Sequence, residues 1–172
     1  IILGLAVVLF SALAAAHKSQ EVHIYDINRE REFAMSEILP ALKQNRILLV
    51  GEHHNNKRHH QAQINVVRLL KESGVQVAIG LEMFRSDSQE ALDKWVAGKI
   101  SKTDFEAVFY DNWGYSWENY RVIFDYAREQ KIPLIGLNVP REITRQVATH
   151  GFQSLNKEQR GKLSNISCRV DK

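Results

Sequence analysis

The residues of this chain with the clearest chemical potential directly follow a short apolar run. The run Ile47–Val50 stops at Gly51, and Glu52, His53 and His54 come immediately after it. Four of the seven histidines lie between positions 53 and 60. Imidazole and carboxylate groups ligate borderline metals and carry protons near neutral pH. Because open α/β folds bind ligands beyond the ends of their strands, this segment predicts a functional cluster at the mouth of a sheet.

Two later apolar runs also end in polar side chains. Glu82 and Asn138 each close such a run, and Arg141 lies three residues after Asn138. Strand ends share one edge of a parallel sheet, so these side chains are expected to converge with Glu52 and its neighbours. A structural alternative stays open, in which Glu82 pairs with Arg141, Asn138 caps the pair, and the set only ties loops together.

A metal-dependent hydrolase is one function that these residues could perform. His53, His54 and Glu82 are the candidate ligands of a divalent metal ion such as zinc, manganese or iron. The metal could activate water, with Glu52 or Glu82 acting as the base. Arg141 could hold a carboxylate or phosphate group of the substrate through two parallel hydrogen bonds. Of the two histidines that follow in the next helix, one is expected to face the strand ends and the other solvent.

Haem binding is a second function, indicated by the aromatic segment 110–120. A tyrosine phenolate can ligate ferric haem, and a flat aromatic surface suits a porphyrin. Tyr115 and Tyr120 are the candidate axial ligands, and His150 could reach a haem propionate. Core packing is the preferred interpretation of Trp117 and Tyr120, whereas Tyr115 suits a loop site equally well. For His150, the simplest interpretation is a helix-terminal histidine that interacts with the helix dipole.

The elements that must position these residues alternate along the chain between apolar runs and helical spacing. An unbroken run such as Ile47–Val50 is typical of a strand covered on both faces. Strands are predicted at 22–25, 46–51, 75–81 and 133–137, and helices at 33–42, 56–73, 86–98, 101–110, 117–130, 140–150 and 156–163. This order is typical of right-handed βαβ units, so the predicted class is α/β, a parallel sheet flanked by helices with a smaller helical portion.

The two ends of the chain suggest export and truncation. Ile1–Ala16 is almost wholly apolar and ends in small residues, which predicts a secretory signal peptide. An N-terminal anchor that associates with the membrane is the alternative, although sixteen residues fall short of the roughly 20 that a span needs. Residues 17–172 are predicted to form one domain that is truncated at its C-terminal end. Cys168, the single cysteine, is interpreted as an incidental thiol.

The charge of the chain argues against nucleic acid as a partner. The formal net charge is only +3, and basic residues are interspersed with acidic ones instead of forming a patch. A globular domain with a small-molecule ligand or a protein partner remains.

Several motifs, taken in order, resemble the ChaN-like haem-binding family within the Tiki, TraB and erythromycin-esterase-like superfamily. The resemblance covers roughly residues 40 to 152 and is fairly specific because the order matches. The motifs are Gly51-Glu-His-His54, Lys57-Arg-His-His60, Leu81-Glu-Met-Phe84, Trp113-Gly-Tyr115 with Tyr120, and Leu137-Asn-Val-Pro-Arg141.

This resemblance implies an exported haem-binding protein of the periplasm or outer membrane that takes part in haem or iron uptake. Haem would be its ligand, and two subunits could clasp haem between them as a homodimer. Gly51 and His54 also match the first Gly-x-x-His motif of metal-dependent Tiki-like proteases, and Glu82 matches a superfamily glutamate. Neither Gly151 nor Gly161 is followed by a histidine three residues later, so the second Gly-x-x-His motif of these proteases is absent from this sequence. The metal-dependent hydrolase is therefore kept as the alternative to haem binding. A partner-binding domain whose ancestral site has decayed is a third interpretation.

Overall fold

The computed structural model describes residues 23–163, which divide into two units at Ile38. In the first unit, strand β1 (His23–Asp26) pairs antiparallel with β2 (Arg31–Ala34), and the 3-10 helix η1 (Met35–Ile38) follows. The Asp26 side chain closes the turn by accepting hydrogen bonds from two backbone N–H groups at 2.9 and 3.1 Å. The predicted strand at 22–25 is therefore confirmed from His23 onward.

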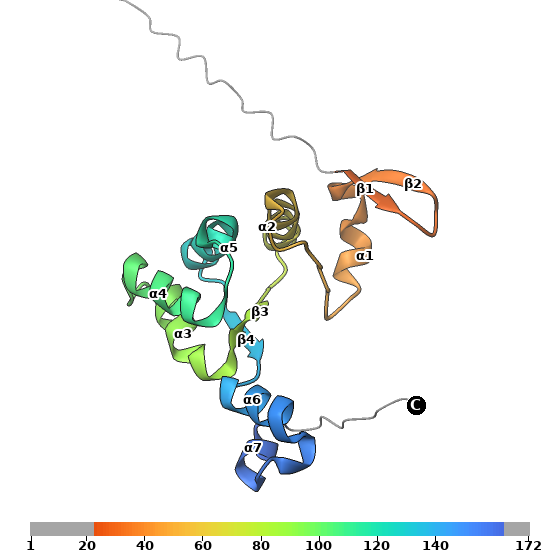
Figure 1. Cartoon of the computed structure of the whole chain (residues 1–172). Helices are drawn as coiled ribbons and strands as arrows, with labels where there is room; N and C mark the ends of the chain where they lie inside the picture. Colours follow the sequence, from red (N-terminus) through yellow and green to blue (C-terminus); the bar gives the residue numbers. More distant parts are fainter. Residues whose placement is uncertain (1–22, 164–172) are drawn as a thin grey trace, which may run out of the picture. The chain divides into compact units, whose positions relative to one another are not determined.

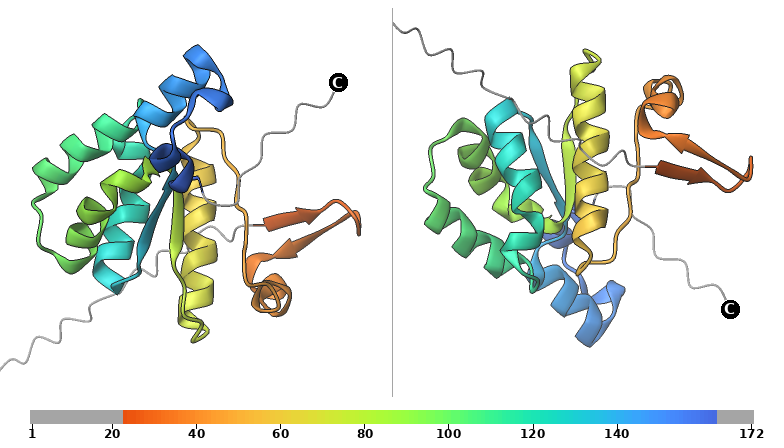
Figure 2. Two further views of the ribbon diagram at one scale, coloured as in Figure 1. Left: turned by 90° about the horizontal axis from the view of Figure 1, so that it is seen from below. Right: turned by 90° about the horizontal axis from the view of Figure 1, so that it is seen from above.

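The second unit contains the parallel sheet that the sequence predicts. Strands β3 and β4 pair in parallel, with Ile79 opposite Leu134, and helices flank them (Figures 1 and 2). The predicted α/β class is confirmed. The elements are α1 (Leu39–Lys43), α2 (Lys57–Glu72), β3 (Ile79–Arg85), η2 (Ser86–Ser88), α3 (Gln89–Ala97), α4 (Lys102–Asn112), α5 (Trp117–Gln130), β4 (Leu134–Asn138), α6 (Arg141–His150), η3 (Phe152–Ser154) and α7 (Lys157–Gly161).

Local capping explains where several of these helices begin and end. The Asn56 side chain accepts a hydrogen bond from Arg58 N at the start of α2, and Ser101 does the same for Asp104 N at the start of α4. Helix α3 ends at Gly98, whose φ of 74° is the left-handed conformation that glycine adopts without steric cost. These boundaries lie within a few residues of the predicted ones.

An aromatic core holds helices α3, α4 and α5 against the strands. The rings of Trp95 and Phe105 stack at 4.3 Å, and those of Trp117 and Phe124 stack at 5.2 Å. The Trp95 indole N–H donates to Phe124 O at 2.8 Å, so its polar atom is satisfied inside the core. Helix α2 lies alongside α5 (Figure 1), and this packing brings His60 of α2 close to Tyr120 of α5.

Three predictions about the strands and the first helix are wrong. Residues 46–51 form no strand: Leu49 is 94% exposed, and no strand among residues 23–163 pairs with this segment. An apolar run alone cannot make a strand, because the backbone groups need a partner strand. Strand β3 begins at Ile79 and continues through Glu82 to Arg85, instead of spanning 75–81. The helix predicted at 33–42 is divided between β2, η1 and α1.

A groove of about 690 Å³ lies between segment 46–51, which forms no strand, and β3. Apolar side chains line much of it, including Leu48, Val50, Leu70, Ile79 and Met83. This volume falls within the roughly 300–1,000 Å³ that is common for small-molecule sites.

Two predictions fall outside the described residues: the signal peptide or anchor at Ile1–Ala16, and the assignment of Cys168. Within residues 23–163, no helix combines the length and the apolar character needed to cross a membrane.

Candidate functional site

A largely buried polar cluster is centred on the carboxylate of Glu52, whose side chain is 9% exposed. Its Oε1 accepts a hydrogen bond from the Tyr120 hydroxyl at 2.5 Å and lies 2.9 Å from His54 Nδ1. Its Oε2 lies 2.6 Å from His60 Nε2. Helix α2 supplies His60 and helix α5 supplies Tyr120. The packing of these two helices therefore brings together side chains that are up to 68 residues apart in the sequence.

Glu52 is held in its charged form. Burial alone would raise the pKa of Glu52, but hydrogen bonds from Tyr120 and His54, together with the charge interaction with His60, outweigh burial and lower it. A carboxylate has no proton to donate, so Tyr120 Oη and His54 Nδ1 must both donate to it. Glu52 thereby determines the proton positions of both neighbours.

His60 is the buried member of the second histidine pair. Its ring is 1% exposed and lies 4.3 Å from the Tyr120 ring, while His59 lies nearer the surface and accepts a hydrogen bond from His53 N. Burial lowers the pKa of His60, and the neighbouring Glu52 carboxylate offsets only part of this effect. No group among the described residues makes a well-aligned hydrogen bond to either nitrogen of His60. The imidazole is therefore neutral near pH 7.

Tyr120 is firmly committed to this cluster. Burial raises the pKa of Tyr120 well above its usual range, and the hydrogen bond to Glu52 raises it further. The phenol consequently keeps its proton, and its oxygen already bonds to Glu52. As a candidate axial ligand, Tyr120 would have to break this bond and lose a strongly held proton.

His54 and two aromatic residues form the accessible side of the cluster. The His54 side chain is 33% exposed and lines the groove described above. Its ring lies edge-on to Trp113 at 5.0 Å and 4.7 Å from Tyr115, and the Trp113 and Tyr115 rings are 5.5 Å apart. The loop between α4 and α5 carries both aromatic residues. These three rings form an aromatic wall, to which haem is chemically suited.

Three further residues that the sequence predicts as site residues, Glu82, His53 and His150, lie outside the aromatic wall, and Glu82 alone among them lines the groove. Glu82 is exposed on β3 and lines the groove together with Glu52 and His54. His53 is exposed, and its backbone faces His59. His150 is exposed at the end of α6, and no hydrogen bond or ion pair within residues 23–163 links it to the cluster.

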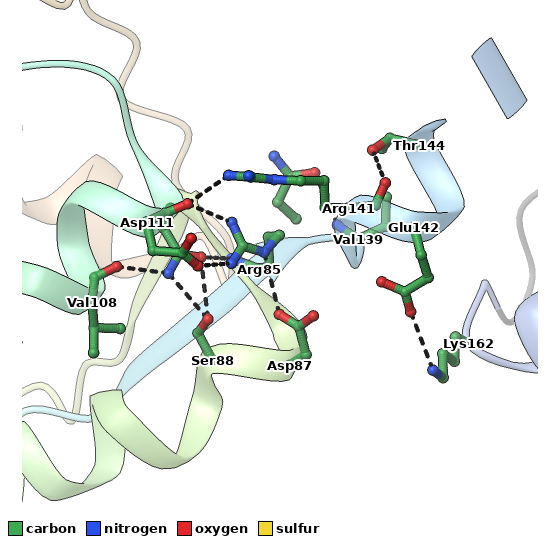
Figure 3. Close-up of polar contacts among 12 residues, drawn as sticks. Arg85, Asp87, Ser88, Val108, Asp111, Val139, Arg141, Glu142, Thr144 and Lys162 are labelled. Carbon is green, nitrogen blue, oxygen red and sulfur yellow. Dashed lines mark hydrogen bonds and ion pairs between the residues drawn. The ribbon is translucent and has the colours of Figure 1, made fainter. Parts of the chain in front are cut away.

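Arg141 belongs to a different polar cluster at the ends of the strands (Figure 3). Arg141 Nη2 donates to Asp111 O at 2.7 Å, and Arg85 donates to the same carbonyl oxygen at 2.9 Å and to the Asp111 carboxylate at 2.5 Å. Among residues 23–163, the Asn138 side chain makes one hydrogen bond, which its Oδ1 accepts from Val139 N. The alternative in which Glu82 pairs with Arg141 is therefore wrong, because Arg141 contacts Asp111 instead.

Sequence reasoning missed His60 as a site residue. The buried stripe of α2 includes Ile64, and His60 lies one helical turn before it. That spacing could have identified His60 as the inward-facing histidine. Nothing local in the sequence indicates that Arg85 would meet Asp111, because this contact depends on how α4 packs against β3.

The cluster does not resemble a site for a bare metal ion. Among residues 23–163, no group of three or more His, Cys, Asp or Glu side chains is arranged to hold one. The polar atoms of Glu52, His54 and His60 face one another instead of converging on a common point. Haem makes a smaller demand, since the porphyrin supplies most of the iron ligands and the protein supplies the axial one.

Comparisons with known proteins identify related sequences and folds. A family model described as "Haem-binding uptake, Tiki superfamily, ChaN" matches residues 38–170. A solved structure titled "Cofacial heme binding to ChaN of Campylobacter jejuni" has a TM-score of 0.62 and 21% sequence identity, over 76% of this chain and 54% of that chain. The present chain thus spans about half the length of that structure, and at this identity the likeness shows a shared fold. No curated protein gives a significant match.

Proposed function

The chain belongs to the ChaN family of the Tiki superfamily, and we propose on that premise that it is a haem-binding protein of the cell envelope with a role in haem or iron uptake. The observation that carries the proposal is that the family match spans the groove and the aromatic wall of His54, Trp113 and Tyr115. The envelope location depends on the apolar start of the chain, and the uptake role depends on the description of the family. A homodimer that clasps haem stays a prediction from the sequence resemblance.

The groove offers what haem needs besides an axial ligand. Apolar side chains of α2 and β3 can cover the porphyrin faces, and His54 of the aromatic wall lines the same groove. Lys43 and Arg46 line the same groove, so they are the cations available to neutralise the propionates. The earlier assignment of His150 to the propionates stays a prediction, and its exposed position on α6 lends it no support.

A haem titration of the full chain, followed by the Soret band, tests this proposal. We expect saturable binding that weakens when Lys43→Glu and Arg46→Glu are combined, because these changes place negative charge beside the propionates. The matched control combines Lys99→Glu and Lys102→Glu, two exposed lysines that do not line the groove; Lys99 follows α3 and Lys102 is the first residue of α4. An unsaturable Soret change, or equal weakening by the control pair, would refute a defined haem site in the groove.

A further inference from the structure

Segment 46–51 lies across the groove from β3, and we propose that it closes the groove by pairing with the free edge of β3 as a third parallel strand. The structure holds the segment in its detached state. Within residues 23–163, the backbone groups of Ile47, Leu48 and Leu49 make no hydrogen bond. Ile47 and Leu49 also expose most of their apolar surface to water, which is unfavourable. Pairing with β3 would give these backbone groups partners.

The segment already runs in the direction that such a strand needs. Lys43 donates to Ser73 O, just after α2 ends, whereas Glu52 lies against His60 in the first turn of α2. The chain between these two contacts is therefore antiparallel to α2. Gly74 then reverses the chain with a φ of 83°, and β3 returns along the same helix (Figure 2). Segment 46–51 and β3 are thus parallel, as the two strands of a βαβ unit are.

The sheet can gain a strand at β3 but not at β4. The outer edge of β4 is occupied by the side chain of Gln89, which donates to Leu134 O at 2.8 Å and accepts from Gly136 N at 3.0 Å. This amide therefore makes the two hydrogen bonds that a neighbouring strand would make. Among residues 23–163, no other strand joins β3 and β4, so the second edge of β3 is the one left free.

The free edge of β3 faces the groove. Ile79 N donates to Pro133 O at 2.9 Å, on the β4 side. Successive backbone groups of a strand point to opposite edges, so the N–H of Gly80 points away from β4 and that of Leu81 points toward it. Gly80 is exposed and lines the groove. Its N–H is therefore the group that an incoming strand would meet.

The side chains of segment 46–51 already alternate as those of a strand do. Leu48 and Val50 line the groove, whereas Ile47 and Leu49 are exposed outside it. The groove also has an apolar lining from α2, made of Val66, Val67 and Leu70. Closure would place Leu48 and Val50 against this helix, which is how strands of a parallel sheet are buried.

A strand in the groove and a ligand in the groove exclude one another, because both need the space between segment 46–51 and β3. A ligand that binds only the detached state shifts the population toward that state. This consequence rests on the proposed haem-binding function, whereas the closure itself does not. Segment 46–51 would then act as a strap that haem must displace.

Residue-resolved hydrogen exchange of the ligand-free full chain tests the closure. The amide of Leu81 serves as an internal control, since it faces β4 in both states. If the segment closes, the amide of Gly80 should be protected from exchange as well. Exchange at Gly80 as fast as in an unstructured peptide, beside a protected Leu81, would overturn the proposal. This comparison needs only the unchanged protein, so it holds even if a variant does not fold.

Leu48→Pro and Leu49→Pro are each other's matched control. Proline removes one backbone N–H, and successive N–H groups point to opposite edges, so only one of the two variants loses a hydrogen bond to β3. That variant should speed exchange at Gly80 by about 10-fold, roughly the effect of one hydrogen bond, and the other should change it much less. Equal effects, or protection that grows with protein concentration, would contradict closure; the second result would place a strand of another copy on this edge.

The same measurement with haem separates the strap from the proposed function. Saturating haem should speed exchange at Gly80 and leave Leu81 unchanged. If haem binds saturably but Gly80 stays protected, the exclusion between strand and ligand is wrong. If haem does not bind, the proposed function fails, while the exchange of the ligand-free chain still decides whether segment 46–51 closes.

Discussion

Two polar clusters in this chain use similar charged groups at very different depths. In the first, Glu52 and His60 are nearly inaccessible; in the second, Arg85 is mostly covered while Asp111 is 63% exposed (Figure 3). Burial makes the protonation states of the first cluster depend on one another. Exposed pairs such as the second contribute little to stability because water screens them. The difference indicates that burial couples the groups of the Glu52 cluster, whereas the Asp111 cluster fastens α4 and α6 to the end of β3.

The largest expected effect is that of removing the central carboxylate. Glu52→Ala should lower the free energy of unfolding by about 3 kcal/mol, because it leaves the buried Tyr120 hydroxyl and His54 Nδ1 without their acceptor. Urea denaturation at pH 7.5 measures this change. A loss no greater than that caused by Asp111→Ala would erase the contrast between the two clusters.

Tyr120→Phe should have a smaller effect of the same sign. It removes the hydroxyl that donates to Glu52 but keeps the ring that packs on His60 and Phe109, so we expect a loss of about 2 kcal/mol, the size of a hydrogen bond to a charged group. The change is measured in the same urea series. The control is Tyr110→Phe, since Tyr110 is half exposed and its hydroxyl accepts only a 3.2 Å bond from Trp117 N. Equal losses of unfolding free energy in Tyr120→Phe and Tyr110→Phe would show that the charge of Glu52 does not strengthen the hydrogen bond from Tyr120.

Acidification should destabilise the Glu52 cluster in two steps. The pKa of His60 lies below its ordinary 6.5 in the folded protein, so the unfolded chain takes up this proton first, and stability falls as the pH drops below about 6.5. The lowered pKa of Glu52 acts in the same direction below its ordinary 4.5. Urea midpoints measured from pH 7.5 to 4 should record both losses. In His60→Phe, the loss of stability between pH 7.5 and about 5.5 should be smaller. An unchanged pH profile in that variant would show that His60 is not the group responsible for this loss.

The smallest expected effect is that of opening the exposed cluster. Asp111→Ala removes the carboxylate that pairs with Arg85 but keeps the backbone carbonyl that both arginines contact, so the loss should be about 0.5 kcal/mol. Thermal unfolding at low and high salt measures it. A loss above about 2 kcal/mol would mean that this cluster is as important as the buried one.

Features that depend on a few neighbouring residues could be predicted from the sequence. The start of α2 at Asn56, the start of α4 at Ser101 and the end of α3 at Gly98 follow from capping chemistry, and β4 ends at Asn138 as predicted. The segment 46–51 shows the opposite case. Its apolar pattern favours a strand, but a strand also needs a partner, and a single run of residues carries no information about one.

The sequence predicts the residues of the site separately, and only the fold shows that they meet. It places Glu52 in a hydrolase centre and Tyr120 in a haem site, yet one hydrogen bond connects the two side chains. Their connection depends on the packing of α2 against α5 across 68 positions of sequence, which no motif reveals. His53 and Arg141 lie outside this cluster: the His53 N–H donates to His59, and Arg141 donates to Asp111 O.

The haem affinity of Glu52→Gln, compared with that of Asp111→Asn, tests most directly whether the buried cluster is the functional one. Both changes replace a carboxylate by an amide of similar shape. We expect Glu52→Gln to weaken haem binding by about 10- to 100-fold, because an amide accepts the hydrogen bonds of Tyr120 and His54 less strongly and so holds His54 less firmly beside the groove. Asp111→Asn should leave the affinity unchanged. Unaltered binding in Glu52→Gln, or an equal loss in both variants, would contradict the account.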